Sequence, residues 1–344
     1  MADPRFISVV IPVRDGAAVI GRCLTAAFAS RYPRFEVVVV DDASEDATLQ
    51  IAAGFDCRIV RLDRHSGVSK ARNAGARASR GELLFFIDSD CLLGPGTLAR
   101  ADASFGARKD RVLGGTYTPL PADRDFFSAF QSISIHHLET RTNPPDYVAA
   151  HAMVIDAELF RRSGGFVEDS FIGLAASVED VELCHRLRRS GTGLLVDPGL
   201  QVTHVFRFSL WRSARNAFRK ASYWTTYSMA NGDMLADSGA ASRQLKASVC
   251  SSLAMAALLC SCAASGVLWP LLPAAALLGF SVFINRSLIA AFRGAKGPLF
   301  SIQAFSYYLT IYAFTVAAGG LAGAARYLWS IRLLRRYPPC TRRS

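Results

Sequence analysis

Two aspartates at the end of an apolar run are the most informative chemical feature of this sequence. Asp88 and Asp90 follow the segment LLFFI, with Ser89 between them. Alternate side chains of an extended chain share a face, so both carboxylates can point at one cation. Such hard oxygen ligands suit Mg²⁺ or Mn²⁺ bridging a diphosphate. Asp123 and Asp125 repeat the spacing in a proline-rich loop, so position rather than pattern makes the first pair the candidate metal site.

A second group of polar side chains follows two other strand-like runs. Asp41 and Asp42 close the run EVVVV, and Pro12, Arg14 and Asp15 lie at the end of FISVVIPV. Parallel strands end at one edge of their sheet, so these residues should line a single crevice. A carboxylate there can accept a hydrogen bond from a base N–H while an arginine faces phosphate. The alternative is that the aspartates only form the turn before the next helix.

A third acidic pair opens a helix-like segment, residues 178–189, which Gly191 would close. A carboxylate at such a position can act as a general base and take the proton of a reacting hydroxyl. Asp180 is the candidate base, with Glu179 beside it. The alternative is that both acids only compensate the helix dipole, as acids in a first helical turn do.

The elements that must position these side chains read as alternating strands and helices. Ser44 is expected to cap the second helix and Gly81 to terminate the third. The pattern predicts half of a doubly wound α/β domain with its ligand crevice at the carboxyl ends of the strands. Later strands are predicted at 112–117 and 147–155. The earlier strands are predicted at 6–13, 36–40, 58–62 and 83–88, and the helices at 17–30, 45–54 and 69–80.

The last hundred residues have a different composition. Hydrophobic residues make up 51% of the chain, and almost no charge occurs in 247–283 or 301–325. Each stretch exceeds the roughly 20 residues that span a bilayer. The first is long enough for a hairpin turning around 266–273, and the second either crosses or re-enters. Residues 208–231 mix aromatic with basic residues, as in a helix lying in the membrane interface, the alternative being an ordinary packing helix.

Charge and cysteine usage exclude several classes of protein. The net charge is +11, but much of the excess follows residue 205 beside apolar stretches, where it suits anionic lipid headgroups better than nucleic acid. The eight cysteines are scattered without a C-x-x-C pair, which fits neither a disulfide framework nor a zinc site. The N-terminus lacks the pattern of a cleaved signal, so the first domain is expected in the cytoplasm.

Taken together, these motifs resemble a known family. The segments ISVVIPVRDGAAVIGRCL, FEVVVVDDASEDAT, HSGVSKARNAGARASRGELLFFIDSD and RRSGGFVEDSF...SVEDVELCHRLRRSG are similar to family 2 glycosyltransferases of the GT-A fold. The resemblance covers about residues 6–206. It implies a Rossmann-like nucleotide-diphospho-sugar transferase domain, an activity of sugar transfer and a bound Mg²⁺ or Mn²⁺.

The resemblance also implies roles for individual residues. Asp42 would contact the nucleobase, Asp180 would be the base, and His204 would complete the metal site of Asp88 and Asp90 or meet the diphosphate. A lone histidine on a strand can equally be structural. The turn after Arg161 and Arg162, with Gly164 and Gly165, would lie beneath the acceptor. The other residues implied at the nucleotide sugar are Pro12, Arg14, Asp15, Gly67, Lys70, Asn73, Asp88 and Ser89.

Two departures from the family pattern narrow the prediction. Arg14 stands where relatives often carry an aromatic or another polar residue, which leaves the base-stacking side of the pocket open. The Q-x-x-R-W segment of processive polysaccharide synthases is absent near 210–225, where LWRSARNAF stands. A single addition is therefore favoured over polymerisation.

The sequence thus predicts three regions: a catalytic domain at 1–206, an interfacial helical region at 207–245, and a membrane region at 246–344 with two or three hydrophobic segments and a basic tail. The predicted function is inverting transfer of one sugar from a UDP- or GDP-sugar to a lipid or lipid-linked acceptor at the cytoplasmic face of the inner membrane. One alternative is a nucleotidyltransferase, which would need a glycine-rich basic loop after the first strand. Another is an inactive scaffold of a glycan-assembly complex, which would have no reason to keep Asp42, Asp88, Asp90 and Asp180.

Overall fold

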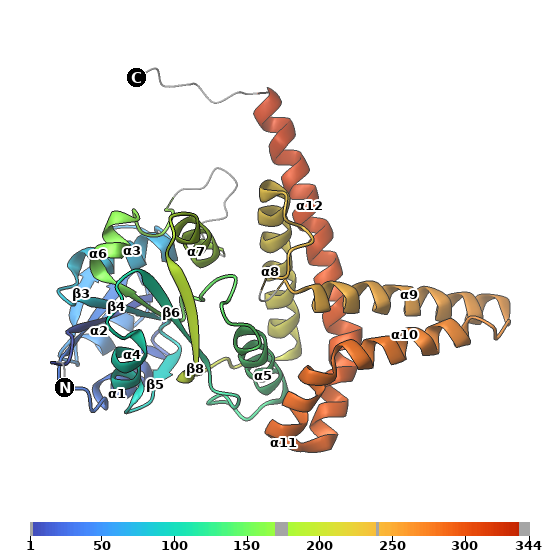
Figure 1. Cartoon of the computed structure of the whole chain (residues 1–344), viewed down its shortest axis with the longest axis horizontal. Helices are drawn as coiled ribbons and strands as arrows, with labels where there is room; N and C mark the ends of the chain where they lie inside the picture. The colour runs from blue at the N-terminus through green and yellow to red at the C-terminus, as the bar shows by residue number, and fades with distance from the viewer. Residues whose placement is uncertain (1–2, 169–177, 239–240, 337–344) are drawn as a thin grey trace. The chain divides into compact units, whose positions relative to one another are not determined.

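The computed structural model describes residues 3–168, 178–238 and 241–336 (Figure 1). The chain forms two compact units, Met1–Arg207 and Phe208–Ser344. Each unit buries its own apolar side chains, such as Val9 and Phe86 in the first and Phe292 and Ala304 in the second. The part of the predicted basic tail beyond residue 336 lies outside the described residues.

An eight-stranded sheet with the order β3-β2-β1-β4-β7-β6-β8-β5 organises the first unit. Its parallel half consists of β1 (Ile7–Val13), β2 (Phe35–Asp41), β3 (Arg58–Arg61) and β4 (Leu83–Ile87). All side chains of β1 and β4 are buried, as expected for β-branched and aromatic runs covered on both faces. The mixed half consists of β5 (Cys91–Leu93), β6 (Arg111–Tyr117), β7 (Ala152–Asp156) and β8 (Gly193–His204). The predicted α/β class is confirmed.

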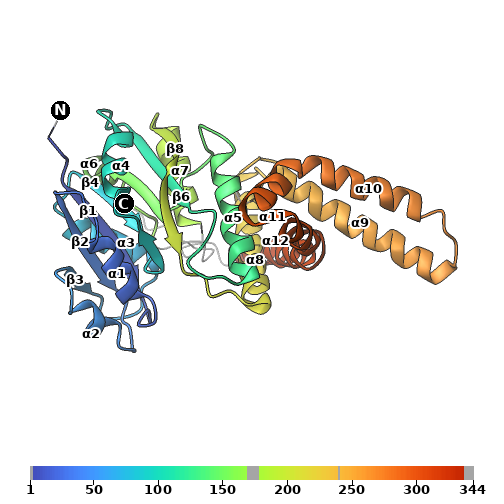
Figure 2. The ribbon, with the colours of Figure 1, turned by 90° about the horizontal axis from the view of Figure 1, so that it is seen from below.

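Helices cover both faces of this sheet (Figures 1 and 2). On one face Leu84, Phe86 and Met153 pack with Phe160 and Leu183 in a single apolar core. That core joins α3 (Val68–Ala78), α6 (Ala157–Arg162) and α7 (Glu179–Arg189) to the strands. The first unit also contains α1 (Ile20–Phe28), α2 (Thr48–Ala52), α4 (Thr97–Phe105) and α5 (Phe126–Thr140).

Two predicted helix ends are wrong. The third helix ends at Ala78, and Ser79 is already extended, so Gly81 is no C-cap. A Cβ on Gly81 would lie 2.5 Å from the backbone nitrogen of Ser8, which shows that close packing on β1 is what requires glycine there. The second helix begins only at Thr48, and Ser44 does not cap it. The remaining predicted elements agree within a few residues, except that the strand predicted from 147 begins at 152.

The second unit is entirely helical in its described part. A kink at Gly297, whose φ is +85°, divides α11 just before Pro298. Its helices are α8 (Leu210–Asn231), α9 (Arg243–Ser265), α10 (Leu271–Ile284), α11 (Arg286–Tyr307), the π-helical turn η2 (Tyr308–Tyr312) and α12 (Ala313–Arg336).

The helices α8 and α12 pack closely through small residues. A Cβ on Gly323 would lie 2.3 Å from the carbonyl oxygen of Ser222, and one on Gly319 would lie 2.4 Å from that of Phe218. The Thr226 hydroxyl donates to the Gly323 carbonyl at 3.0 Å. Glycines four residues apart allow two helix backbones to approach in this way. One face of α8 is therefore a packing face, although Trp211 on the same helix is 67% exposed.

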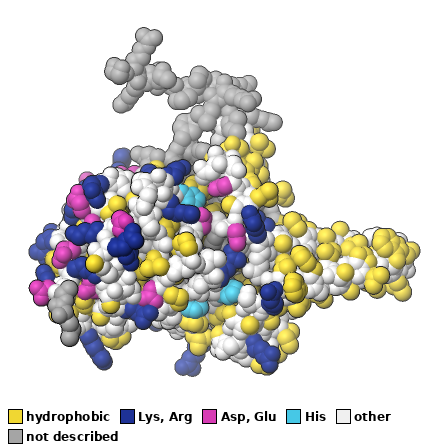
Figure 3. Space-filling view, viewed as in Figure 1, with side chains coloured by type: hydrophobic (Ala, Val, Ile, Leu, Met, Phe, Trp, Pro, Cys, Tyr) yellow, Lys and Arg dark blue, Asp and Glu magenta, His cyan; other side chains and the backbone are white. Residues whose placement is uncertain are grey.

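The helices α9 and α10 form the predicted hairpin, with Gly266 at its turn in the left-handed conformation. Hydrophobic side chains cover this hairpin on the surface that Figure 3 shows. Within the described residues, the helical stretches Arg243–Ser265 and Arg286–Ser330 are long and apolar enough to cross a membrane. Whether residues 301–325 cross or re-enter stays a prediction.

Candidate active site

The parallel strands bring the predicted polar groups to one edge of the sheet. Strand β1 lies between β2 and β4, so the strand order reverses there and a crevice opens at the carboxyl ends. Val13 pairs with Asp41 at the last position of β1 and β2. Asp88 follows β4 directly. The strand order therefore brings together the carboxyl ends of β1, β2 and β4, which carry the polar residues predicted at the site.

Asp42 is buried and organises the loop that leads into α3. Its carboxylate accepts hydrogen bonds from the backbone nitrogens of Ser66 at 2.6 Å and Gly67 at 2.9 Å. The Nδ1 atom of His65 lies 2.7 Å from the same carboxylate. The His65 side chain is 55% exposed, so a ligand donor can take its place without disturbing the two backbone bonds. Gly67 precedes α3 with a φ of +90° that favours glycine.

The loops after β1 and β2 are tied together through Asp15. Its backbone nitrogen donates to the Ser44 hydroxyl at 3.0 Å, and its carboxylate accepts from the Glu45 nitrogen at 2.9 Å. Arg14 lies 3.4 Å from the Asp15 carboxylate and is about one-third exposed. Pro12 is buried in β1 opposite Val40. Arg14 is thus the member of this group that can reach a phosphate.

Arg72 connects the end of β4 to the start of α7. Its Nη2 atom donates to Asp88 at 2.7 Å and its Nη1 atom donates to Glu179 at 2.6 Å. The Arg72 side chain is only 4% exposed. Arg72 was not named as a site residue, although it lies in the segment from Lys70 to Asn73 that the resemblance places by the nucleotide. Its position between Lys70 and Asn73, both predicted, was the available signal.

Several carboxylates around this one guanidinium have shifted pKa values. Burial acts to raise the pKa of Asp88, but the charge and hydrogen bond of Arg72 together with the charges of His151 and His204 lower it overall. Burial, together with the charge of Asp180, raises the pKa of Glu179 to about 7. Burial also raises the pKa of Asp180, against the opposing charge of Arg72. Asp180 accepts from the backbone nitrogens of Ala150 at 3.2 Å and Val181 at 2.8 Å.

Of the two acids at the start of α7, Asp180 is better placed to act as a base. Glu179 is buried and engaged with Arg72, whereas Asp180 is only partly buried and bonded by backbone amides. The assignment of Asp180 as the base, with Glu179 as its neighbour and charge partner, stays a prediction.

Asp90 and His204 form a potential metal site with Cys91. One ligand atom from each of these three residues lies within 4.8 Å of the others. The pairing of β5 with β8 places Cys91 opposite His204, and the His204 Nε2 atom lies 3.4 Å from Asp90. The His204 ring stacks on Phe206 with 3.7 Å between centroids. Ring stacking and strand pairing therefore fix the imidazole beside the carboxylate.

The donor chemistry of this group can hold a divalent cation, and its imidazole favours Mn²⁺ over Mg²⁺. A carboxylate and an imidazole are ligands that Mn²⁺ accepts. Burial raises the pKa of the Cys91 thiol well above its usual value in the absence of a metal ion. Asp88, predicted as the other metal ligand, is engaged with Arg72 and is absent from this cluster of ligand atoms.

The other predicted residues lie around the same crevice with different partners. The Asn73 side chain donates to the carbonyl of Phe166 at 2.8 Å and accepts from its nitrogen at 2.9 Å. Asn73 therefore holds the segment after Gly165, whose φ of +69° forms the predicted turn after α6. Lys70 is partly buried in the first turn of α3, and Ser89 is partly buried between the two aspartates.

His151 is a second residue that the sequence did not assign. It is buried, and its ring stacks on Tyr117 with 4.0 Å between centroids. When charged, His151 lowers the pKa values of Asp88, Asp90 and Asp180. It therefore lies close enough to the acidic groups to influence their charge. Its segment carried no sequence pattern that could have indicated this.

The fold and site define the class of protein. A mixed α/β sheet with acidic groups at the carboxyl ends of its parallel strands is the arrangement of GT-A domains. Residues 8–163 match the family described as Glycosyl transferase family 2. The first unit is therefore similar to this family over most of its length, as predicted.

Individual relatives agree with this assignment. The pre-mycofactocin glycosyltransferase of Mycobacterium tuberculosis is 30% identical over 227 residues, covering 62% of this chain and 46% of the relative. Glycosyltransferase AglE of Haloferax volcanii is 41% identical over 93 residues, covering 25% of this chain and 31% of the relative. The chain thus spans less than half the length of these curated relatives.

A solved structure shares the fold. It is the mannosyltransferase PcManGT from Pyrobaculum calidifontis in complex with GDP-Man and Mn²⁺, with a TM-score of 0.57 and 19% identity. The match covers 96% of this chain and 88% of that chain. At this level of identity the likeness establishes the GT-A fold.

Proposed function

We propose that the chain is an inverting glycosyltransferase that moves a single sugar from a UDP- or GDP-sugar to a lipid or lipid-linked acceptor. The observation that carries this proposal is the Arg72 bridge, which holds Asp88 at 2.7 Å and Glu179 at 2.6 Å. It brings the end of a donor-side strand and the helix that bears the base Asp180 into one cluster. A scaffold protein would have no need of a buried guanidinium between these two groups.

In the proposed reaction, Asp180 takes the proton of the acceptor hydroxyl as its oxygen attacks the anomeric carbon. The bond from that carbon to the diphosphate breaks, and the nucleoside diphosphate leaves with its electron pair. Asp90 and His204 would hold Mg²⁺ or Mn²⁺, which would neutralise charge on the diphosphate. Asp42 would bind the base and Arg14 the phosphates, with the loop residues Gly67, Lys70 and Ser89 around them.

The second unit supports a lipid acceptor. Leu268 and Leu272, near the turn of the α9–α10 hairpin, are 70% and 79% exposed, an arrangement that an apolar phase stabilises. We place the protein at the inner membrane with its first unit in the cytoplasm, where nucleotide sugars are made.

The test is release of nucleotide from a panel of UDP- and GDP-sugars by the detergent-solubilised full chain, with and without Mn²⁺. GDP-mannose is the first donor to try, because the solved relative carries GDP-Man and Mn²⁺. We expect turnover of one donor that depends on the metal and is lost in Asp90→Asn. Asp123→Asn, in the second D-x-D of the chain, is the matched control and should keep full activity.

A separate measurement of Mn²⁺ binding by electron paramagnetic resonance distinguishes loss of the metal from loss of fold. Binding should weaken in Asp90→Asn and in His204→Gln and stay unchanged in Asp123→Asn. If no donor binds or turns over with membrane lipids present, the proposal is wrong and the scaffold alternative replaces it.

A further inference from the structure

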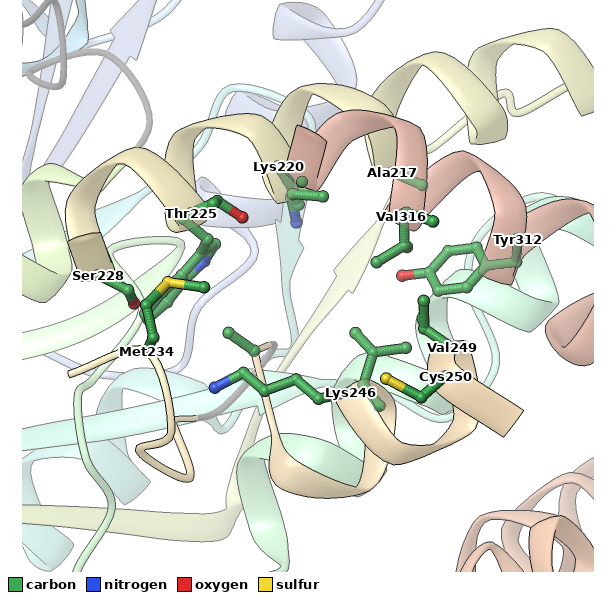
Figure 4. Close-up of a pocket in the computed structure, with 16 residues that line it drawn as sticks. Ala217, Lys220, Thr225, Ser228, Met234, Lys246, Val249, Cys250, Tyr312 and Val316 are labelled. Atoms are coloured by element: carbon green, nitrogen blue, oxygen red, sulfur yellow. The ribbon is translucent and has the colours of Figure 1, made fainter. Parts of the chain in front are cut away.

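The second unit contains a cavity of about 240 Å³ between α8, α9, the end of η2 and the first turns of α12 (Figure 4). Most of its lining is apolar, with Trp224, Val249 and Val316 among the larger side chains. Two lysines, Lys220 on α8 and Lys246 on α9, also line it. A cavity that combines an apolar wall with two amines has the character of a site for an amphiphile.

The Lys246 amine and the two valines face different parts of the cavity, although Met234 lies beside Ser228 (Figure 4). Figure 4 shows the Lys246 amine extending toward the side where Ser228 lies. Val249 and Val316 lie together at the opposite side, next to Tyr312. A ligand with an anionic head and one apolar chain can satisfy both sides at once, whereas a wholly polar or wholly apolar ligand satisfies one.

The charge of the lining favours an anion. Among the described residues that line the cavity none is acidic. The Lys246 amine donates to the carbonyl of Ala236 at 2.7 Å, which leaves hydrogens on the same nitrogen for a ligand. Asp233 and Asp237 also act on the charge of Lys246, so an anionic ligand would share that amine with them.

We infer that this cavity binds one lipid with a phosphate head group, the phosphate near the two lysines and one hydrocarbon chain against the apolar wall. The volume lies just below the roughly 300–1,000 Å³ of small-molecule pockets, which fits a single chain. The surrounding helices include the stretch Arg243–Ser265, which is long and apolar enough to enter a membrane. The inference goes beyond the proposed function, because it would hold if the sugar acceptor were another molecule.

The test uses native mass spectrometry of the full chain released from an uncharged detergent and titrated with hexadecyl phosphate. We expect one bound copy per chain. Lys220→Gln and Lys246→Gln should each weaken binding about fivefold, the effect of removing one lysine near a lipid phosphate. Arg215→Gln is the matched control, because Arg215 also lies on α8 but stacks on Trp211 outside the lining. Val249→Trp should fill the cavity and abolish binding.

Two outcomes would overturn the inference. One is that hexadecanol or inorganic phosphate alone binds as tightly as hexadecyl phosphate. In that case the site would not bind the head group and the chain of one ligand at the same time. The other is that both lysine variants bind like the wild type. Donor turnover is measured on the same preparations without the lipid, so a failure of the lipid site leaves the transferase proposal standing and the converse also holds.

Discussion

At the scale of single residues, Arg72 places one guanidinium between Asp88 and Glu179. Lysine keeps the charge but cannot reach two carboxylates with separate N–H groups. We therefore expect Arg72→Lys to lower kcat/KM by about 100-fold, as loss of a preorganised electrostatic group does. Unfolding in denaturant should show a stability loss of about 3–5 kcal/mol, typical of a broken buried ion pair.

The matched control for that substitution is Arg77→Lys. Arg77 lies on the same helix and is 64% exposed, with Glu168 at 3.6 Å. Its substitution should therefore change neither kcat/KM nor the free energy of unfolding by a measurable amount. If Arg72→Lys kept wild-type kinetics and stability, the bridge would have no role in holding the site together.

The raised pKa of Asp180 sets the direction of the pH dependence. A general base acts in its deprotonated form, and burial raises the pKa of Asp180. Activity should therefore fall as the pH is lowered, with the midpoint above the value of about 3.9 of a free aspartate. Asp180→Asn should remove more than 99% of kcat, since proton transfer contributes about 10²–10⁴-fold.

The pH profile of kcat/KM for the wild type and Asp180→Glu measures this effect. The longer side chain retains a carboxylate, so the glutamate variant should keep a pH limb while losing rate. A profile that is flat down to pH 4 would assign the base to another group.

Single site residues could be predicted from sequence where they directly follow an apolar strand. Asp42 and Asp88 follow strongly apolar runs. Such runs predict buried strands, so both residues could be placed at the carboxyl ends of the sheet. Arg72 and His151 could not be found in this way, because their contacts come from α7 and from Tyr117, which are distant in sequence. Asn73 was identified as a site residue, but its partner Phe166 lies in a turn that sequence alone does not place.

At the scale of elements, the contact between α8 and α12 depends on a backbone approach that tolerates no Cβ at Gly323. An added Cβ there would lie 2.3 Å from the Ser222 carbonyl oxygen. We expect Gly323→Ala to separate the helices and to destabilise the second unit by about 1–3 kcal/mol, as overpacking does. Thermal unfolding of the full chain in detergent measures the loss.

Gly320 provides the control on the same helix. The nearest atom to a Cβ at Gly320 is the Thr225 hydroxyl at 3.6 Å, an ordinary contact. Gly320→Ala should therefore leave the melting temperature unchanged or raise it slightly, because alanine favours the helix. Equal destabilisation by both substitutions would mean that helix propensity or local strain, and not the approach of α8, explains the glycines.

Helices and strands were predicted correctly where their own sequence determines them, and less well where contacts with distant segments do. The strands β1, β2 and β4 contain continuous apolar runs, and all four parallel strands were placed within about two residues. The helix ends at Gly81 and Ser44 were not, because the contacts of both residues are with other segments, Ser8 and Asp15. The strands β5 and β8 pair although more than 100 residues separate them in the sequence. A local sequence pattern does not predict such a pairing.

At the scale of the whole molecule, a unit with buried strands is joined in one chain to a unit with exposed apolar helices. In the second unit, Leu268, Trp269 and Leu272 are 70%, 68% and 79% exposed. Burying one such leucine in an apolar phase contributes about 1.5–3 kcal/mol. We therefore expect the full chain to stay with phosphatidylcholine vesicles after detergent removal, even in 1 M salt, where surface electrostatics are screened over about 3 Å.

Replacing both Leu268 and Leu272 by glutamine should weaken this association by about 3–6 kcal/mol, the sum of two side-chain transfers. Co-flotation with vesicles on a density gradient measures the bound fraction. Leu120→Gln is the matched control, because Leu120 is a 49% exposed leucine of the first unit and should not matter. Release of the wild type by salt would show instead that the basic residues alone hold the protein at the membrane, and the hairpin would then need another apolar partner.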